Sequence, residues 1–460
     1  MPRPGGAPPA DVSEAPSTLV DDVLAAESSR GRGLRAHLRD PLHRKGYLLV
    51  LGAGAGSLLG FLFWALAAHE YPARVVGLNS AAIAAMMLVS GACQLGLNAV
   101  LVRYLPRSGP AARVFVVRSY AVTVAISLLV GGAAAASSEL WSPELGFLAR
   151  EPAWFAGFVL ATAVWTVFAL QDSVMIGLDA VHWVPIENSI YSLVKLVLLV
   201  AFVGLLPFAG PFVAWNLPLV GAVAIVTLLI FRRLIPRHRA RDPTGSVDRH
   251  QIVSVARGNY GGTLFALAST TLLPILVANF AGAAQTAYFY IPWTISAGLQ
   301  LVAFNMTTSL TVEAALDEAR LRDLTRRALR LTFALVLPLT ALTAFAAPWG
   351  LGAFSAAYAD AGVTLLQLLA LAAIPNVLVV LGLTISRIQH RGRMVLAIEA
   401  VQCVIVLGLS VALLPDHGIT GIGIAWLVSQ TAVAAWLLAG LLRPILSGGR
   451  RAMPAEPGKM

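Results

Sequence analysis

The sequence has few groups that could form disulfides or bind a metal. It contains two cysteines among 460 residues, Cys93 and Cys403, and both fall within long apolar stretches. Two isolated cysteines provide neither a disulfide framework nor the ligand spacing of a zinc site. We therefore expect no metal site, no cofactor and no redox chemistry.

Charged residues are scarce as well, at 12% of the chain against 58% hydrophobic residues. The uncharged residues form runs of about 18 to 23, which as helices are long enough to cross roughly 30 Å of hydrocarbon. We predict an all-α integral membrane protein with about twelve transmembrane helices. The predicted spans are 46–68, 80–101, 114–136, 153–170, 184–206, 212–231, 258–280, 286–308, 329–349, 363–385, 394–414 and 420–442.

Carboxylates are absent from the middle of every predicted span. Glu187, Glu313 and Glu399 lie near the predicted inner ends of their spans. An ionisable group within a membrane usually marks an ion or substrate path. The sequence therefore does not support proton or sodium coupling through a carboxylate at the membrane midplane.

Basic residues fall in alternate gaps between the spans. Of the 33 Lys and Arg residues, 30 lie in the two tails, in the gaps that follow even-numbered spans or, as Arg118 and Arg330 do, at the start of the span after such a gap; only Arg74, Arg150 and Lys195 lie elsewhere. Because cytoplasmic loops hold an excess of Lys and Arg, we predict a multi-pass protein of the cell membrane with both termini in the cytoplasm. The net charge of +10 then suits an anionic inner leaflet, and we expect no nucleic-acid binding.

The longest internal polar segment divides the predicted spans into two sets of six. We predict an N-lobe at 46–231, a cytoplasmic linker at 232–257 and a C-lobe at 258–442. Residues 1–45 lack the apolar core of a signal peptide and predict a disordered basic cytoplasmic tail, with a second cytoplasmic tail at 443–460.

The gaps leave no room for a soluble catalytic domain, and all eight histidines fall in tails or loops. Acid–base machinery at the membrane is therefore missing, and we predict that the protein is not an enzyme and has no catalytic residue. The gap at 171–183 is acidic, whereas the other inside gaps are basic. It is either a solvated connector or a segment for gating or partner binding.

One charged residue lies where a bilayer makes it most costly. Lys195 falls at the middle of the fifth predicted span, and an ammonium there costs about 3 kcal/mol unless it faces a partner or an aqueous cavity. Asn188 and Tyr191 precede it by seven and four residues, so they share its helix face. Two interpretations follow: a buried carboxylate such as Glu399 or Glu187 neutralises the lysine, or this stripe lines a cavity that faces a substrate.

A second polar stripe follows the eighth predicted span, where Trp293 and Gln300 recur with Tyr290 and Ser296 at three- to five-residue spacing. A wet cavity would explain this stripe, and so would hydrogen bonds between helices. Trp293 and Gln300 are therefore candidate cavity residues.

Short motifs across residues 44–442 resemble a known family. They include Gly46-Tyr47, Tyr71-Pro72 with Val76-Gly77, and Leu95-Gly96-Leu97 leading to Val102-Arg103-Tyr104-Leu105-Pro106. The stretch from Gln171-Asp172 to Asn188, followed by Lys195, is similar to the fourth loop and fifth helix of that family. The chain thus resembles the polysaccharide (Wzx-like) flippase branch of the multidrug, oligosaccharidyl-lipid and polysaccharide (MOP) exporter superfamily.

This resemblance implies two six-helix lobes in a V shape around a central cationic cavity. It also implies a transporter that moves a polyprenyl-pyrophosphate-linked oligosaccharide across the cytoplasmic membrane by alternating access. Lys195 fits such a cavity best, and Arg118 and Arg257 are either residues of its cytoplasmic mouth or inside anchors. The implied partners are the anionic lipid-linked glycan, membrane lipids, and a glycan polymerase or glycosyltransferases of the same pathway.

Other classes fit the sequence less well. A MATE-like exporter of small molecules or drugs would usually carry a membrane carboxylate for cation coupling. A major facilitator would carry a Gly, Asp and Arg signature after the second span, where this chain reads Arg103-Tyr104-Leu105-Pro106-Arg107. A membrane-embedded enzyme of glycan assembly would need acid–base groups that the spans lack.

Overall fold

The structure, a computed structural model, describes residues 41–238, 249–316, 321–389 and 391–442. Residues 1–50 and 51–460 form two separate units. Of the first unit the structure describes residues 41–50, which begin helix α2 (Pro41–Glu70). Part of the predicted tail, 41–45, is therefore helical, whereas 1–40 and 443–460 lie outside the described residues.

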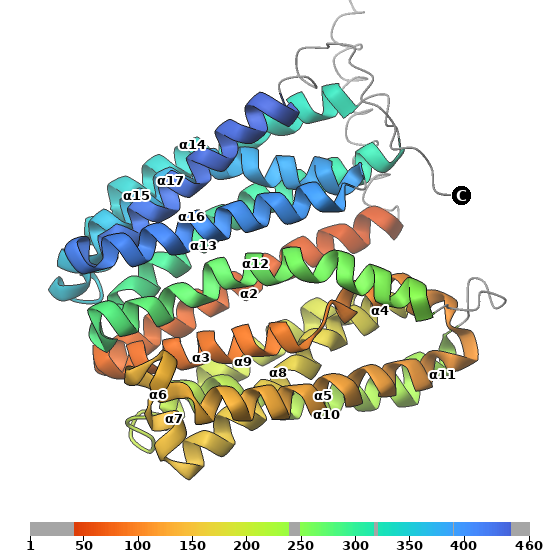
Figure 1. The fold of residues 1–460 in the computed structure, drawn as a ribbon, viewed down its shortest axis with the longest axis horizontal. Helices are drawn as coiled ribbons and strands as arrows, with labels where there is room; N and C mark the ends of the chain where they lie inside the picture. Colours follow the sequence, from red (N-terminus) through yellow and green to blue (C-terminus); the bar gives the residue numbers. More distant parts are fainter. Residues whose placement is uncertain (1–40, 239–248, 317–320, 390, 443–460) are drawn as a thin grey trace, which may run out of the picture. The chain divides into compact units, whose positions relative to one another are not determined.

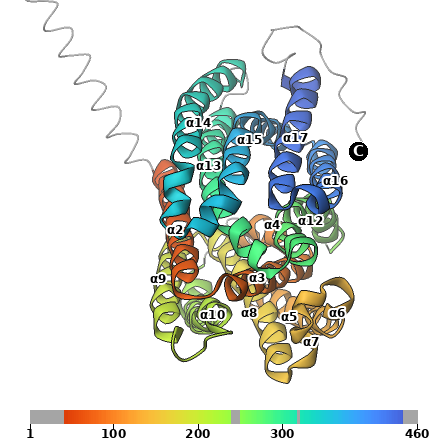
Figure 2. The ribbon, with the colours of Figure 1, turned by 90° about the vertical axis from the view of Figure 1, so that its left-hand side faces the viewer.

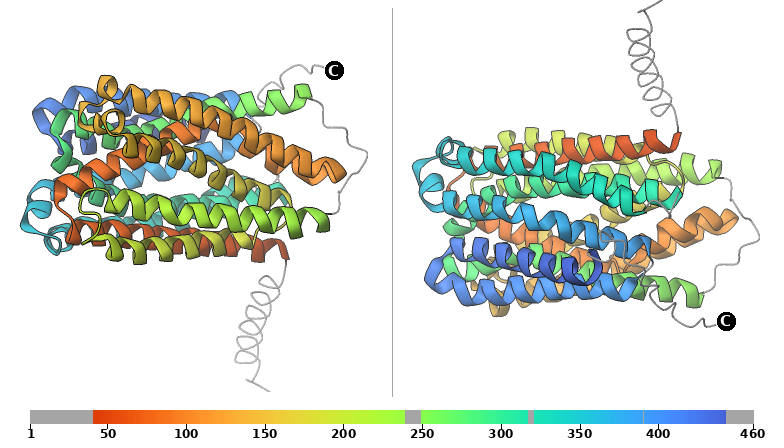
Figure 3. Two further views of the ribbon diagram at one scale, coloured as in Figure 1. Left: turned by 90° about the horizontal axis from the view of Figure 1, so that it is seen from below. Right: turned by 90° about the horizontal axis from the view of Figure 1, so that it is seen from above.

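Helices form all the regular secondary structure of the described residues. Ten of the described helices are long and apolar enough to cross a membrane, as expected for a multi-pass membrane protein. Figure 3 shows these helices running along a common direction. The predicted N-lobe spans correspond to α2, α3 (Ala73–Cys93), α5 (Ala112–Ala136), α8 (Pro152–Gly177), α9 (Trp183–Phe202) and α10 (Gly210–Leu229). The predicted C-lobe spans correspond to α12 (Arg249–Ala281), α13 (Ala283–Leu316), α14 (Leu321–Gly352), α15 (Ala356–Ile388), α16 (Gly392–His417) and α17 (Ile419–Leu437).

The second span differs from its prediction of 80–101. Its helix α3 ends at Cys93, because Leu95 and Gly96 adopt positive φ angles of 52° and 72°. The chain then continues as the short helix α4 (Leu97–Tyr104). A Cβ on Gly96 would lie 2.5 Å from the carbonyl oxygen of Ala256. Glycine therefore meets two requirements here, a left-handed backbone and a close approach of α12.

Two predicted connections are partly helical. Helix α8 continues to Gly177, so Gln171 and Asp172 belong to a helix rather than to a loop. Helix α12 begins at Arg249, and helical turns continue α10 as far as α11 (Ile235–Arg237), so both ends of the predicted linker are helical. Residues 239–248, the middle of the linker, lie outside the described residues.

Helix α3 packs against both α12 and α13, so it joins the two sets of helices. Figures 1 and 2 show α13 to α17 on one side and α5, α8 and α10 on the other. The approach of α3 to α13 depends on Gly77, because a Cβ there would overlap the backbone carbonyl of Ala283. Small residues at such a crossing let the two backbones come close, as in other membrane helix pairs.

We call the contact of α3 with α12 and α13 the seam, and hydrogen bonds lie at both of its ends. At one end the Tyr260 hydroxyl donates to the Ala92 carbonyl oxygen at 2.9 Å. At the other end the Asn279 amide donates to the Trp141 carbonyl oxygen at 2.8 Å and accepts from the Ser142 hydroxyl at 2.6 Å. The segment with Trp141 and Ser142 connects α5 to α8, so Asn279 ties the end of α12 to the N-terminal set of helices.

We expect Gly77→Ala to lower the unfolding temperature of the detergent-solubilised protein, because the added methyl group must force α3 and α13 apart. Overpacking of this kind costs about 1–3 kcal/mol. The matched control is Gly132→Ala in α5, where a Cβ would meet nothing within 4 Å. The control gains helix propensity without a clash and should be neutral or stabilising. Equal unfolding temperatures for the two variants would contradict the close α3–α13 crossing.

Candidate functional site

Lys195 is buried in α9 among three aromatic rings. Its side chain is 3% exposed, and Nζ lies 3.8 Å from the ring centroid of Trp215, 4.9 Å from that of Tyr191 and 5.4 Å from that of Phe63. A cation over an aromatic face gains about 2 kcal/mol when both are desolvated. These rings can therefore offset much of the cost of placing an ammonium within the membrane. We call Lys195, Phe63, Tyr191 and Trp215 the lysine cage.

Hydrogen bonds between side chains and the backbone help to position two rings of the lysine cage, those of Tyr191 and Trp215. The Tyr191 hydroxyl donates to the carbonyl oxygen of Trp215 at 3.1 Å, which joins α9 to α10. The start of α10 is fixed by Asn79, which accepts from the Phe212 amide at 2.9 Å and donates to the Phe208 carbonyl oxygen at 2.9 Å. Because Asn79 belongs to α3, the helix that forms the seam also sets the position of Trp215.

Tyr71, in the turn between α2 and α3, anchors the far end of α9. Its hydroxyl donates to the Leu199 carbonyl oxygen at 3.4 Å. Burial raises the pKa of Tyr71 above its ordinary value, and the neighbouring Glu70 carboxylate raises it further. The hydroxyl therefore stays protonated at neutral pH and remains a donor.

The aromatic cluster reaches across to the second set of helices. Trp64 of α2 lies 5.7 Å from Trp215 and 4.6 Å from Tyr290 of α13, measured between ring centroids. The Trp64–Tyr290 contact thus closes the lysine cage against a helix from the other half of the chain.

The cage leaves two polar donors unsatisfied. Among the residues that the structure describes, no carboxylate lies within 4 Å of the Lys195 ammonium. The buried indole N–H of Trp215 also has no hydrogen-bond partner there. Neither predicted carboxylate neutralises the lysine, because Glu399 lies 3.9 Å from Arg387 and both buried oxygens of Glu187 lack hydrogen-bond partners. In that part of the chain, the cage therefore holds a lysine without a carboxylate partner beside a free N–H donor.

The other predicted cavity residues lie apart from the lysine cage. The Asn188 amide donates to Val184 within its own helix at 3.0 Å. Arg118 and Arg257 are exposed on α5 and α12. Trp293 packs on Trp426, with ring centroids 4.8 Å apart. The Gln300 amide donates to Ser296 at 3.3 Å. Of the predicted set, the structure brings together Lys195 and Tyr191.

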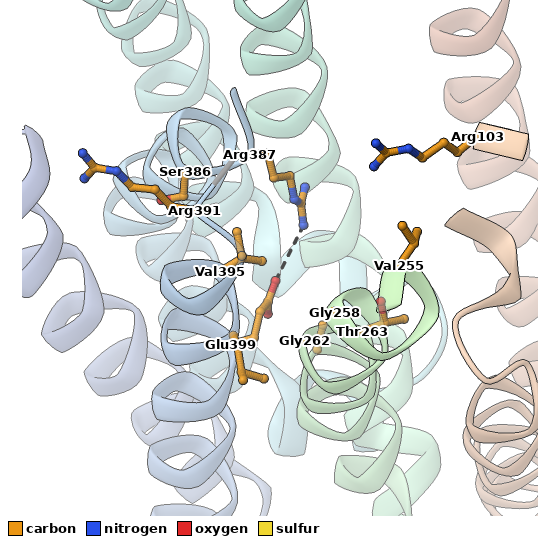
Figure 4. A pocket seen from close by; sticks show the side chains of 13 residues that line it. Arg103, Val255, Gly258, Gly262, Thr263, Ser386, Arg387, Arg391, Val395 and Glu399 are labelled. Carbon is orange, nitrogen blue, oxygen red and sulfur yellow. Dashed lines mark ion pairs between the residues drawn. The ribbon is translucent and has the colours of Figure 1, made fainter. Parts of the chain in front are cut away.

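A separate cavity of about 650 Å³ opens between α4, α12, α15 and α16 (Figure 4). Arg103, Arg387 and Arg391 line it together with Glu399, and Gly258 and Gly262 leave space on the α12 side. Figure 4 shows the Arg103 side chain reaching from α4 toward Arg387, whereas Arg391 points away from both. By the predicted topology this arginine cavity faces the cytoplasm.

Sequence reasoning missed most of the side chains that build these two features. Phe63 and Trp215 have the character of ordinary apolar residues in the sequence, although a tryptophan near the start of the span after Lys195 is a usable signal. The sequence marks Arg387 as an inside charge, and Arg103 as an inside charge within a family motif, but it does not predict that the two line one cavity. No spacing within one helix relates them, because they come from α4 and α15.

No protein-family model matches the sequence, and none of the curated proteins matches it significantly. Several solved structures share the fold. An inward-facing conformation of a multidrug resistance MATE family transporter of the MOP superfamily aligns with a TM-score of 0.70 at 14% identity, covering 86% of this chain and 96% of that one. An outward-facing conformation of a multidrug resistance MATE family transporter of the MOP superfamily aligns at 0.64 with 17% identity, covering 91% and 98%. A MOP superfamily transporter from Pyrococcus furiosus aligns at 0.59 with 15% identity, covering 87% and 96%, and is described as having a binding pocket of reverse polarity that suggests a different function.

These similarities confirm the predicted fold class, an all-α membrane protein with about twelve helices in two lobes of the MOP type. At this level of identity they define the fold alone. The lobe boundaries, the cytoplasmic termini and the Wzx-like branch stay predictions.

We expect Lys195→Met to leave the unfolding temperature unchanged or to raise it. Methionine keeps the length and packing of the side chain, and an apolar group replaces an ammonium that has no carboxylate partner. By contrast, Trp215→Leu should lower the free energy of unfolding by about 2 kcal/mol or more, because it removes buried ring volume and the cation–π contact with the Lys195 ammonium. Thermal unfolding in detergent measures both. A large loss of stability in Lys195→Met alone would show that the lysine is a structural residue.

Proposed function

We propose that this protein is a transporter that moves an anionic lipid-linked substrate across the membrane by alternating access. The proposed substrate is a polyprenyl-pyrophosphate-linked oligosaccharide, as expected for the Wzx-like branch. The observation that carries the proposal is the uncompensated ammonium of Lys195 beside the unpartnered indole N–H of Trp215. A pyrophosphate would supply the missing negative charge and the missing hydrogen-bond acceptor.

The sign of this charge distinguishes between classes of substrate. Two unit charges 4 Å apart interact by about 4 kcal/mol at an effective dielectric constant of 20. The lysine cage would therefore attract a pyrophosphate and repel a lipophilic cation. The Pyrococcus furiosus protein supports the principle that pocket polarity varies within this fold, since a reversed polarity is linked there to a different function.

Access to the lysine requires movement, because Lys195 is buried and Tyr290 closes its cage. Neighbours of this fold are known in inward-facing and outward-facing conformations, and this chain aligns better with the inward-facing one. In the proposed cycle, separation of Trp64 from Tyr290 opens the cage to the substrate headgroup.

A second candidate function is the export of small molecules. It is favoured by the structural neighbours that are described as multidrug resistance MATE family transporters. Under this alternative Lys195 would be a structural cation, and a lipophilic cation would be moved in preference to an anionic lipid.

The deciding experiment is transport in proteoliposomes that contain the full-length protein. The probes are a fluorescent polyprenyl-pyrophosphate-linked disaccharide, whose leaflet is read by an impermeant quencher, and a fluorescent lipophilic cation. We expect movement of the anionic lipid, at least a tenfold loss with Lys195→Met, complete loss with Lys195→Glu and partial activity with Lys195→Arg. An interaction of about 1.4 kcal/mol with the lysine is sufficient for the tenfold effect.

The matched control is Arg113→Met, which removes a positive charge from an exposed position on α5. Wild-type rates in both Lys195→Met and Lys195→Glu would overturn the role of the lysine. Transport of the cation by wild-type protein, without transport of the lipid, would establish the second candidate instead.

Alternating access also predicts an effect of the Asn279 contact. If the end of α12 separates from the α5–α8 connection during the cycle, Asn279→Ala should favour the opened state, because two hydrogen bonds across the seam are lost. Spin labels at Glu151 and Ala284, in a background without Cys93 and Cys403, should show a longer mean distance. Asn216→Ala is the control, since the Asn216 amide donates within its own helix. An unchanged distance distribution in Asn279→Ala would argue against opening at this end.

A further inference from the structure

The arginine cavity shares no lining residue with the lysine cage, and its lining places two arginines, Arg103 and Arg387, with one carboxylate, Glu399. We propose that this cavity is a binding site for a phosphate-bearing anion, held between Arg103 of α4 and Arg387 of α15. The proposal does not rest on transport by the lysine cage.

Arg103 has the geometry of an anion ligand. Its side chain is exposed and reaches into the cavity (Figure 4), and its guanidinium carbon lies 5.7 Å from the centroid of the neighbouring Tyr104 ring. In the described part of the chain no carboxylate forms an ion pair with it. A planar guanidinium that faces an open space suits phosphate, whose oxygens can accept two parallel hydrogen bonds.

Arg387 lies across the cavity from Arg103. It is half exposed and lies 3.9 Å from Glu399, which is largely buried at 8% exposure. This distance is long for a charge-assisted hydrogen bond, so the carboxylate orients the guanidinium without saturating its donors. An incoming phosphate would compete with Glu399 for Arg387, and this makes Glu399 a negative regulator of affinity.

The space for the ligand comes from α12. A Cβ on Gly258 would meet nothing within 4 Å, and one on Gly262 would first meet Val395 at 3.7 Å. Both glycines lie one helical turn apart on the face that borders the cavity. A larger side chain at Gly258 would therefore occupy volume that the ligand needs, without a change of charge.

The surroundings favour a lipid headgroup as the source of the phosphate. Leu396 lines the cavity and is 39% exposed, and Val253 on α12 is 50% exposed. Exposed apolar side chains beside arginines at an inner helix end match an anionic phospholipid, with its acyl chains on the helices and its headgroup in the cavity. A free phosphate or pyrophosphate from the cytoplasm presents the same chemistry to the arginines.

The test titrates the purified full-length protein with short-chain phosphatidylglycerol, short-chain phosphatidylcholine and inorganic pyrophosphate, and counts bound molecules by native mass spectrometry. We expect wild-type protein to bind one phosphatidylglycerol about tenfold more tightly than phosphatidylcholine, the effect of one to two charge-assisted hydrogen bonds. The double variant Arg103→Gln and Arg387→Gln should lose this preference. The double variant Arg107→Gln and Arg393→Gln removes the same charge from exposed neighbours and should keep it.

Two further variants distinguish a specific binding site from non-specific binding to a basic surface. Glu399→Gln should bind phosphatidylglycerol several-fold more tightly, because Arg387 loses its competing carboxylate. Gly258→Leu should bind it more weakly although its charge is unchanged. Tight binding of pyrophosphate, lost in the same arginine variant and without any lipid preference, would support the site and assign it to a soluble anion.

Equal binding by the two arginine double variants would overturn the site. Weaker binding in Glu399→Gln would overturn the competition between Glu399 and the ligand. Because Lys195→Met leaves the arginine cavity intact, it should bind phosphatidylglycerol as wild type does even if it fails to transport.

Discussion

The placement of Lys195 over the Trp215 ring, with no carboxylate partner among the described residues, is the constraint on which the candidate site depends. Placing an ammonium in the middle of a span costs about 3 kcal/mol, and each desolvated cation–π contact returns up to about 2 kcal/mol. The distance of 3.8 Å to Trp215, with Tyr191 and Phe63 further out, brings α2, α9 and α10 to one point. The rings make the charge tolerable without cancelling it. A carboxylate would have stabilised the lysine more strongly but would have left no charge for a ligand.

The seam along α3 determines where that charge lies relative to the other half of the chain. Gly77 brings α3 close to α13, and Asn79, half a turn further on, fixes the start of α10. One helix therefore sets both the crossing between the halves and the position of Trp215. Tyr290 belongs to α13, the helix that Gly77 brings close to α3, so a movement of α13 that separated it from both α3 and α2 would open the seam and the Trp64–Tyr290 contact together.

Much of the fold follows from the sequence, because hydrophobic length and basic-residue placement are local properties. The twelve predicted spans all have helical counterparts among the described residues. The end of α3 was placed too late, since the break depends on the backbone at Leu95 and Gly96 and on the approach of Ala256. Lys195 could be singled out from its own span. Its ring partners could not, because Phe63 and Trp215 lie on other helices and meet the lysine only after packing.

The two cationic features differ in the way each charge is maintained, and this difference bears on function. In the lysine cage the charge is buried among rings, so little solvent screens its electric field. Such a site suits recognition that occurs only when the helices separate. In the arginine cavity the charges are exposed at helix ends, where water and salt weaken them, which suits reversible binding of an abundant anion. A chain that exported lipophilic cations would be opposed by the first feature at every passage of its substrate. An anionic headgroup would be attracted by both, weakly at the arginine cavity and more strongly at the lysine cage.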